Sequence, residues 1–380
     1  MKHFWLEKEE CTGCGACSNI CPVAAITMER DESGFEYPII SEGCIDCNKC
    51  EEVCRGRLSL DSVDLLPPTF AVNSLEEDVR FTSTSGGAFT ELANVVLAKD
   101  GVVFGAAYES CTQIVHDFTE NVKGLVELRQ SKYVQSSIGL SFQDVKRFLK
   151  DGRIVLFCGS PCQIAGLKSF LGECYEKLFT VDFICRGVNS PKALKAWVSE
   201  IEEEHGATAE RVWFKYKENG WRLSPRCTRV VFRDGTVEVF DQNKNTFMCG
   251  YLEQNLYMRP SCAQCDFKGD NRRSDITLGD FWGLDKALDE NKGTTLLLIN
   301  TERGKELFDC AAERMNCEER SFSEIENGNV CFRRSVSLNP KSGKFFSDLD
   351  CLSFSEALKK NSTRKSVLSR AKGFIKGLIK

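Results

Sequence analysis

Two runs of cysteine decide the fold of the first part of this chain: Cys11-Thr-Gly-Cys14-Gly-Ala-Cys17-Ser-Asn-Ile-Cys21-Pro22 and Cys44-Ile-Asp-Cys47-Asn-Lys-Cys50-Glu-Glu-Val-Cys54. Each run has the spacing C-x2-C-x2-C-x3-C. Three thiolates spaced in this way can bind one cubane of iron and sulfide, while the fourth reaches a second cubane. The two runs therefore predict two 4Fe-4S clusters with crossed ligation. The expected ligands of one cluster are Cys11, Cys14, Cys17 and Cys54, and those of the other are Cys44, Cys47, Cys50 and Cys21.

Zinc and disulfide bonds are the alternatives for a segment so rich in cysteine. Structural zinc sites use pairs of cysteines rather than a triplet plus one. Disulfide frameworks belong to small secreted chains. The doubled spacing is instead that of bacterial two-cluster ferredoxins. One secondary feature departs from that pattern, because Arg55 follows Cys54 where Pro22 follows Cys21.

The composition describes a chain larger than a ferredoxin. With 380 residues, 42% of them hydrophobic, it can bury a sizeable core and should form two or three domains. It has 21 cysteines and a charged start without a signal peptide, so we expect a reducing cytoplasm. No stretch has the length of a transmembrane helix. The net charge of −5 gives no reason to expect a nucleic-acid partner.

Residues 359–380 form a separate basic segment, with eight lysines and arginines and no acidic residue. Its apolar residues would share one face of a helix: Val367, Leu368, Ala371, Phe374, Ile375, Leu378 and Ile379. This pattern predicts a basic amphipathic C-terminal helix that makes peripheral contact with anionic lipid at the inner face of the membrane, or with an acidic partner. Docking on the chain's own acidic body is an equal alternative.

The order of helices and strands divides the rest of the chain. A hairpin of residues 26–30 and 35–40 completes an α+β ferredoxin-like module over residues 1–62. Beyond it, helical and strand patterns alternate, which predicts an α/β domain with a largely parallel sheet over residues 63–358. The expected helices cover 89–97, 141–149, 164–170 and a segment starting at Ser190-Pro191, and the expected strands cover 102–108, 153–157 and 178–184. Strand patterns at 211–216, 229–232 and 236–240 predict an antiparallel β insertion.

A third group of cysteines follows the strands of the expected sheet. Cys162 lies in the loop after 153–157, and Cys185 comes directly after 178–184. Ligands bind at the carboxyl ends of parallel strands, so neighbouring strands would bring these two thiols together. The pair Cys262 and Cys265 would complete a third 4Fe-4S site, with Cys158 as a reserve ligand. On spacing alone, buried unreactive cysteines are an equal alternative.

Several motifs in fixed order resemble one known family. They are Ser85-Gly-Gly-Ala-Phe-Thr90, Ser131-Lys-Tyr-Val-Gln-Ser136, Gly159-Ser-Pro-Cys-Gln163, Ile184-Cys-Arg-Gly187, Arg259-Pro-Ser-Cys-Ala-Gln-Cys265 and Ser274-Asp-Ile-Thr-Leu-Gly-Asp-Phe-Trp-Gly283. Together they resemble the coenzyme F420 hydrogenase/dehydrogenase beta-subunit family, over roughly residues 80 to 300. Two departures are visible: Ser160 replaces a usual threonine, and Arg186 stands where the family has histidine.

The resemblance implies FAD beside a 4Fe-4S cluster, and it favours the third cluster. The residues of the matching motifs that are expected to contact the flavin are Ser85, Gly86, Gly87, Ser131, Lys132, Gly159 and Gln163. Gly86 and Gly87 would open a helix and offer backbone N–H groups to a phosphate, and Lys132 would add charge. Without the resemblance, these are an ordinary turn and a surface lysine. No G-x-G-x-x-G sequence is present, which argues against an ordinary dinucleotide site.

The catalytic residues are not evident from the sequence. His116 and Lys132 are weak candidates, and for His116 a hydrogen-bonded structural role is favoured. A flavin can exchange electrons singly or in pairs, so it can join clusters to hydride chemistry. We therefore expect a cytoplasmic, flavin-dependent iron–sulfur oxidoreductase. It would pass electrons between reduced ferredoxin, or another redox subunit, and coenzyme F420 or an organic substrate. The alternative is a non-catalytic electron-transfer subunit of a larger redox complex.

Overall fold

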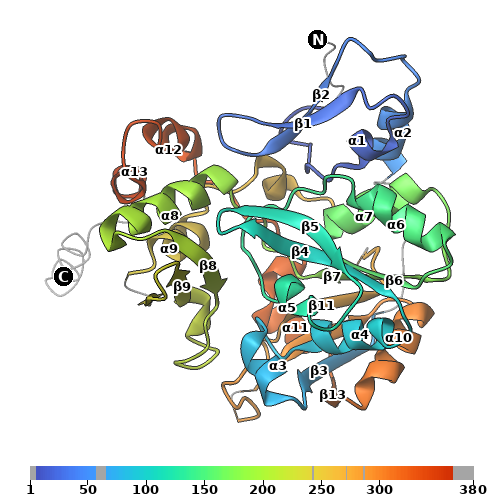
Figure 1. Cartoon of the computed structure of the whole chain (residues 1–380). Helices are drawn as coiled ribbons and strands as arrows, with labels where there is room; N and C mark the ends of the chain where they lie inside the picture. Colours follow the sequence, from blue (N-terminus) through green and yellow to red (C-terminus); the bar gives the residue numbers. More distant parts are fainter. Residues whose placement is uncertain (1–5, 57–65, 242–243, 271, 286, 363–380) are drawn as a thin grey trace, which may run out of the picture.

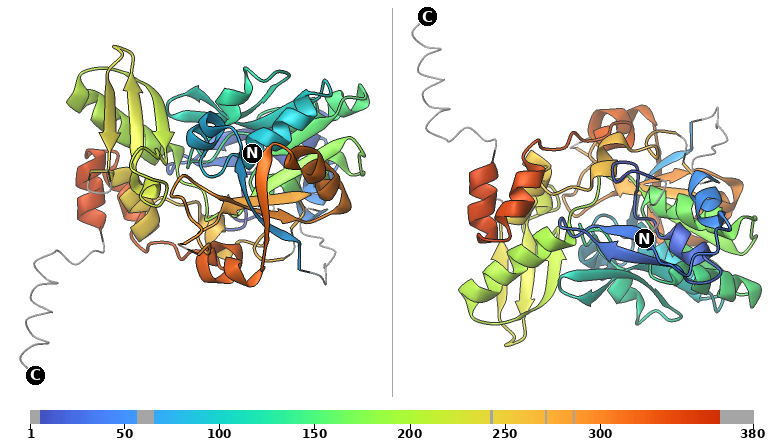
Figure 2. Two further views of the ribbon diagram at one scale, coloured as in Figure 1. Left: turned by 90° about the horizontal axis from the view of Figure 1, so that it is seen from below. Right: turned by 90° about the horizontal axis from the view of Figure 1, so that it is seen from above.

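The computed structural model of the chain describes residues 6–56, 66–241, 244–270, 272–285 and 287–362. Figure 1 shows a small N-terminal module, a large central sheet covered by helices, and a second, smaller sheet beside it. The two further views in Figure 2 show that the module lies across the helices of the central sheet. The structure is therefore built from one large sheet that carries the other parts.

The N-terminal module contains the expected hairpin. Strands β1 (Ile26–Arg30) and β2 (Glu36–Ile40) pair antiparallel around Gly34, whose φ of 84° favours glycine. Two short helices carry the cysteine runs: α1 (Ala16–Ile20) and α2 (Lys49–Gly56). Both helices contact α7 (Pro161–Leu171) of the central body. The module is thus fixed to the body by its cysteine-bearing side.

The central sheet has the strand order β13-β3-β12-β11-β7-β6-β4-β5. Its strands are β3 (Thr69–Ser74), β4 (Val102–Ser110), β5 (Gln113–Thr119), β6 (Val155–Cys158), β7 (Leu178–Phe183), β11 (Ile276–Asp280), β12 (Thr295–Ile299) and β13 (Met315–Arg320). The pairs β4–β6, β6–β7 and β7–β11 are parallel. The α/β centre is therefore confirmed, with its parallel strands adjacent.

The flanks of the sheet differ from the largely parallel sheet that the sequence predicts. Pairs β4–β5, β11–β12, β12–β3 and β13–β3 are antiparallel, so the sheet is mixed. Strand β3 precedes the first helix–strand unit in sequence, but it pairs with β12 and β13, more than 200 residues later. Alternating helix and strand patterns describe only neighbouring segments, so they did not predict that β3 pairs with strands much later in the chain.

Helices cover both faces of the central strands. Alternate residues of β4 point to opposite faces: Val103 packs with α4 (Ala88–Leu97), and Phe104 packs with α6 (Ser141–Lys150). On the first face α4 also contacts α10 (Glu302–Ala312), and on the second α6 contacts α7. Both cores are buried, which gives the sheet a rigid support for its loops.

The smaller sheet is the expected antiparallel insertion. Strands β8 (Ala209–Phe214), β9 (Thr228–Phe232) and β10 (Val237–Phe240) pair in the order β10-β9-β8. They share a core with helices around Trp197 and Phe247. These helices are α8 (Pro191–His205), α9 (Thr246–Gln254), α12 (Ser342–Asp348) and α13 (Phe354–Asn361).

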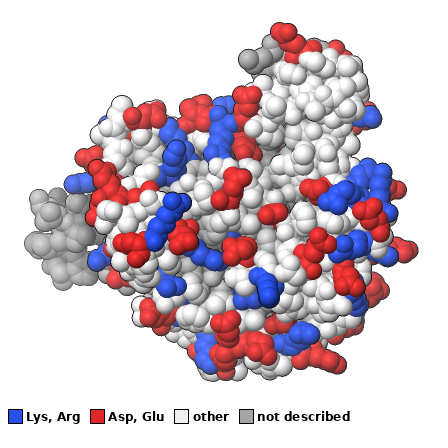
Figure 3. All heavy atoms as spheres, viewed as in Figure 1, with Lys and Arg blue, Asp and Glu red and all other residues white. Residues whose placement is uncertain are grey.

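Short elements make up the remaining described segments. They are α3 (Glu77–Thr82), α5 (Leu125–Leu128), α11 (Ser323–Gly328) and the 3-10 turns η1 (Ser224–Arg226), η2 (Pro260–Gln264) and η3 (Val330–Phe332). The expected helix at 359–380 lies mostly outside the described residues, beyond 362. In the part of the chain that is described, no helix is long and apolar enough to cross a membrane. Figure 3 shows acidic and basic side chains intermixed over the visible face.

The close contact of Gly86 with two strands yields a test of the packing. A Cβ at this position would overlap the carbonyl oxygen of Val72 and lie 2.8 Å from the nitrogen of Thr295. We expect Gly86→Ala to reduce the free energy of unfolding by about 1–3 kcal/mol, as overpacking does. Gly343→Ala is the control, because nothing lies within 4 Å of its Cβ. Equal thermal-unfolding midpoints for the two variants would contradict this packing role.

Candidate functional site

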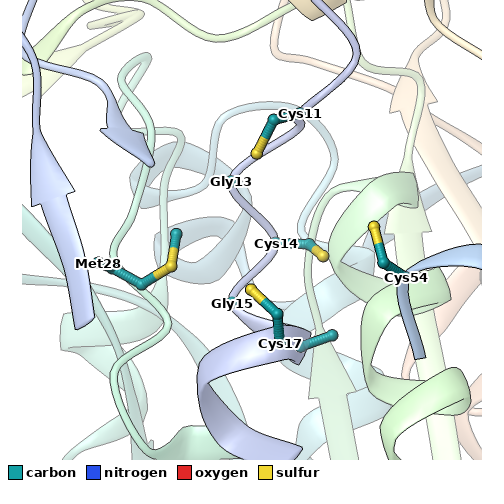
Figure 4. Close-up of a pocket in the computed structure, with 8 residues that line it drawn as sticks. Cys11, Gly13, Cys14, Gly15, Cys17, Met28 and Cys54 are labelled. Carbon is teal, nitrogen blue, oxygen red and sulfur yellow. The ribbon is translucent and has the colours of Figure 1, made fainter. Parts of the chain in front are cut away.

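Four cysteines of the N-terminal module surround one small pocket. Cys11, Cys14, Cys17 and Cys54 line it, together with Met28 of β1 (Figure 4). Burial raises the pKa of the Cys17 thiol well above its usual value, and the charges of the other three thiolates raise it further. Four thiols held together in a dry place favour a bound cation, which would stabilise their thiolate forms.

The other four cysteines of the module gather on its outer side. Cys21, Cys44 and Cys50 pack beside a small core of Cys17, Ile26 and Ile40. Cys50 has a raised pKa because of burial, with added repulsion from Cys44 and Cys47. Cys54 thus lies beside Cys11, Cys14 and Cys17, and Cys21 lies beside cysteines of the run from Cys44. This is the pairing that crossed ligation requires, and the ligand assignments stay predictions.

The expected third group also comes together, at the carboxyl ends of the parallel strands. Strands β6 and β7 are neighbours, so the loops carrying Cys162 and Cys185 leave the same edge of the sheet. Burial raises the pKa of Cys185 to about 12, with further contributions from Cys262 and Cys265. Cys162 has a raised pKa from burial and from the same three cysteines. Lys268 donates hydrogen bonds to the carbonyl oxygens of Cys185 and Cys331.

The reserve ligand Cys158 has different surroundings. Burial raises its pKa to about 12, and the charges that act on it are those of Asp182 and Lys132. None of the other cysteines is among them. The charges around the two thiols therefore favour Cys162 over Cys158 as the fourth member of the group.

Within the described residues, no three His, Cys, Asp or Glu side chains converge closely enough to hold a single metal ion. Two of the three cysteine groups line pockets. A cubane has a separate iron for each cysteine, so its ligands surround a space and do not meet at one point.

A cavity of about 580 Å³ joins the third cysteine group to the expected flavin residues. This volume is within the range of ligand and cofactor sites. Six of the seven predicted flavin contacts line it: Ser85, Gly87, Ser131, Lys132, Gly159 and Gln163. Cys158, Cys162, Cys185, Cys262 and Cys265 line it as well. The motif from Ser274 to Gly283 contributes Asp280 and Trp282, so residues from all six motifs are brought to one space.

Gly86 is the predicted flavin contact that does not line the cavity. Its N–H donates to the Thr295 hydroxyl at 2.8 Å, so the donor is already used. Gly87, next to it, is the N-cap of α4 with a φ of 97°. The cavity reaches Gly87, Ala88 and Phe89, the first turn of that helix. The start of α4 therefore faces the cavity, where a helix N-terminus favours negative charge.

Several buried polar atoms at the cavity have no hydrogen-bond partner among the described residues, and the sequence did not point to them. Near the start of α4, Arg129 Nε, Gln130 Oε1 and Ser83 Oγ are buried and have no hydrogen-bond partner among the described residues. Gln130 also has a φ of 75°, a strained value for a residue other than glycine. Buried polar groups normally have partners, so these atoms indicate a bound group with donors and acceptors. No motif singled out Arg129.

His116 has hydrogen-bond partners at both ring nitrogens, and the structural role expected for it stays a prediction. Its Nε2 lies 3.0 Å from the Cys158 carbonyl oxygen, and its Nδ1 lies 2.8 Å from the Ser136 hydroxyl. A carbonyl can only accept, so Nε2 carries the proton and Nδ1 accepts from Ser136. Burial lowers the pKa of His116 to about 4, which keeps the ring neutral. The ring also stacks on Phe157.

Besides Lys268, two lysines reach the cavity from different elements. Lys132 donates to the carbonyl oxygens of Arg129, at 2.7 Å, and Glu127, at 3.0 Å. Burial, and then the charge of Arg211, lower its pKa to about 7. Lys215, buried just beyond β8, forms an ion pair of 2.6 Å with Asp280 at the end of β11. It also lies over Trp282, whose ring stacks on Trp221.

Helix α7 connects the two cysteine regions. Cys162 lies at its start, and Gly166 lies one turn later. A Cβ on Gly166 would be 3.0 Å from the Cys14 sulfur, so the helix backbone packs against this cysteine. Four residues of helix span about 6 Å, so α7 holds the two groups close to each other.

Comparisons with known proteins agree with both regions. Residues 152–325 match the family model of the carboxyl-terminal part of the coenzyme F420 hydrogenase/dehydrogenase beta subunit, and residues 10–56 match the model of the 4Fe-4S dicluster domain. An uncharacterized ferredoxin of Methanocaldococcus jannaschii is 35% identical over 49 residues, which are 13% of this chain and 64% of that protein. The chain thus spans a little less than two thirds of this relative.

The chain is also similar to a solved structure from the xenon derivatization of the F420-reducing [NiFe] hydrogenase complex from Methanosarcina barkeri. The match covers 80% of this chain and 93% of the other, with 17% identity and a TM-score of 0.45.

The neutral His116 predicts a loss of stability in acid. Its pKa is about 4 in the folded chain and about 6.5 when unfolded, so the unfolded chain binds more protons between these values. The free energy of unfolding should therefore fall as the pH falls, by about 2 kcal/mol between pH 7 and pH 5. Thermal unfolding of the wild type and of His116→Gln at both pH values measures this term. An equal loss in both proteins would contradict it.

Proposed function

Because this chain belongs to the coenzyme F420 hydrogenase/dehydrogenase beta-subunit family and carries a 4Fe-4S dicluster domain, we propose that it is an iron–sulfur flavoprotein oxidoreductase. It passes electrons between ferredoxin-type clusters and a two-electron carrier, either coenzyme F420 or an organic substrate. The observation that carries this proposal is the cavity lined both by the third cysteine group and by the expected flavin contacts.

The N-terminal module holds two 4Fe-4S clusters in this proposal. Cys11, Cys14, Cys17 and Cys54 bind the inner one, and Cys21, Cys44, Cys47 and Cys50 bind the outer one. Such clusters supply one-electron transfer. Cys47 is exposed, whereas Cys11, Cys14, Cys17 and Cys54 are buried. The outer cluster is therefore the place where a reduced ferredoxin or another redox subunit exchanges electrons.

Cys162, Cys185, Cys262 and Cys265 hold a third cluster. Their mutual effect on pKa supports this set, because thiolates so close together repel unless a cation lies among them. Lys268 orients the loops that carry Cys185 and Cys331 by binding their carbonyl oxygens. Such contacts around a metal site fix its ligands in place.

FAD occupies the cavity beside this cluster. The first turn of α4, with Gly87 and Ala88, and the side chain of Arg129 hold its phosphates. Ser131, Gly159 and Gln163 line the remainder of its site. When bound, a flavin supplies the exchange between single electrons and a hydride.

Buried charged residues of the cavity orient bound groups and exchange protons. Lys132, with a pKa of about 7, can take up or release a proton near neutral pH. Lys215 and Asp280 form a buried ion pair at the side of the cavity reached by the antiparallel insertion. Asp280 Oδ1 is buried without a partner among the described residues, so it can accept a hydrogen bond from a substrate.

The domain limits in this proposal are 1–62 and 63–358. Residues 359–380, which lie mostly outside the described residues, supply a basic segment for an acidic partner or a membrane surface. The isolated chain turns over F420 or a substrate if it is an enzyme in its own right. A chain that transfers electrons only within a complex would be the non-catalytic subunit.

The third cluster can be tested with two neighbouring cysteines. Anaerobic reconstitution of the wild type should give about twelve irons per chain, from three clusters of four. Cys162→Ser should lower this to about eight, because it removes one of four ligands. Cys158→Ser is the matched control and should keep about twelve. Eight irons in the wild type, or the same loss in both variants, would contradict the third cluster.

The flavin site can be tested at Arg129, the cavity residue that no motif revealed. Arg129→Met should weaken FAD binding at least tenfold, since hydrogen bonds from charged groups contribute about 1.5–3 kcal/mol. Fluorescence titration of the flavin-free chain measures this affinity. The control is Arg147→Met, on the exposed side of α6 and paired with Asp144. Equal FAD affinity in both variants would rule out the proposed phosphate site.

A further inference from the structure

We propose that Arg259 is a positioning residue that raises the reduction potential of the inner cluster, the one expected on Cys11, Cys14, Cys17 and Cys54. This inference rests on the proposed ligation of the N-terminal module. It does not depend on the third cluster or on FAD. Arg259 belongs to the central body, so the body would tune a cluster that the module binds.

Arg259 is fully buried and its guanidinium group is directed at the cysteine loop. Its Nε donates to the Cys11 carbonyl oxygen at 2.9 Å, and its Nη2 lies 3.8 Å from the Cys11 sulfur. Nη2 also donates to the Glu36 carbonyl oxygen, and Nη1 donates to Gln135 Oε1 at 2.7 Å. The cation lies over the ring of Tyr37 at 4.3 Å. Each of these partners is neutral apart from the cysteine.

Among the described residues, the charge of Arg259 has no carboxylate partner. In contrast Arg272, which is also buried near the cavity, pairs with Asp182. Burying a charge without a compensating partner is strongly unfavourable. A cluster bound by four thiolates carries negative charge close to Cys11, and it would compensate the guanidinium. The buried cation is thus explained if the pocket beside Cys11 holds an anionic group.

The effect on potential follows from charge. A cluster gains one electron and no proton on reduction, so its negative charge increases. A fixed cation nearby stabilises the reduced form more than the oxidised form, and a hydrogen bond to a ligand sulfur acts in the same direction. Because the site is dry, solvent screens this interaction only weakly. Arg259 therefore makes the inner cluster easier to reduce.

The position of this cation is fixed from both sides. Gln135, which accepts from Arg259, donates to the carbonyl oxygens of Thr12 and Gly13. Gly13 has a φ of 65°, and a Cβ there would lie 2.8 Å from Arg259 Nη1. Only a glycine lets the loop come this close. On the other side, the Arg259 carbonyl accepts from the Cys262 N–H at 3.0 Å, so the residue also supports the third cysteine group.

Redox titration followed by electron paramagnetic resonance tests the inference. The titration is carried out on the full chain with Cys162→Ser, so that only the two N-terminal clusters contribute. Arg259→Met should shift one of the two reduction steps to lower potential. The expected shift is at least about 59 mV, which for one electron is a tenfold change in the equilibrium constant of reduction. The other step belongs to the outer cluster and should stay in place, since the contacts of Arg259 described above include none of its expected ligands.

Two further variants separate charge from structure. Arg259→Lys keeps the charge and should shift the step much less than Arg259→Met. Arg30→Met removes an arginine of the N-terminal module whose side chain is 44% exposed. Solvent screens the charge of this arginine, so both reduction steps should stay unchanged. Iron content confirms that each variant still binds its clusters. Equal shifts of both steps, equal shifts for Lys and Met, or no shift for Met would overturn the inference.

Discussion

The contact between helix α7 and the cysteine loop is the constraint on which the arrangement of the molecule depends. Gly166 brings the helix backbone against Cys14, and Ser169, one turn further, donates to the Val53 carbonyl oxygen at 2.6 Å. The same helix starts at the sheet edge beside the cavity. A Cβ at position 166 would lie 3.0 Å from the Cys14 sulfur, so the cysteine loop would have to shift by a few tenths of an ångström. One glycine therefore sets the distance between two groups of thiols that are far apart in sequence.

Local patterns in the sequence predicted most of the elements around this contact. The helix from Pro191 and the strands near 102–108, 178–184 and 229–232 are present with nearly the expected bounds. These segments are amphipathic or buried as units, and their ends carry turn or capping residues. Strand β3 and its partners were not predicted, because pairing across more than 200 residues leaves no periodic pattern.

The same limit applies to the site. The doubled spacing predicts the eight cysteine ligands of the N-terminal module. The other four were predicted from strand order and from the resemblance to a known family, and all twelve assignments stay predictions. Arg129 and Lys215 belong to none of the quoted motifs. Arg259 opens one of them, but the roles of all three come from their burial and from the groups that they face. Lys215 reaches the cavity only because the antiparallel insertion folds back on the sheet. Such roles depend on tertiary structure, which a single sequence does not display.

The way in which the module is held decides how it can work. Its cysteine side is packed against α6 and α7, and the guanidinium of Arg259 donates a hydrogen bond to its Cys11 loop. A domain that carries electrons by swinging between two docking positions needs a loose interface and a flexible connection. This interface is close-packed and leaves no room for such a swing. In the proposed function the module is therefore a fixed terminal, and electron flow through it should be insensitive to the viscosity of the medium.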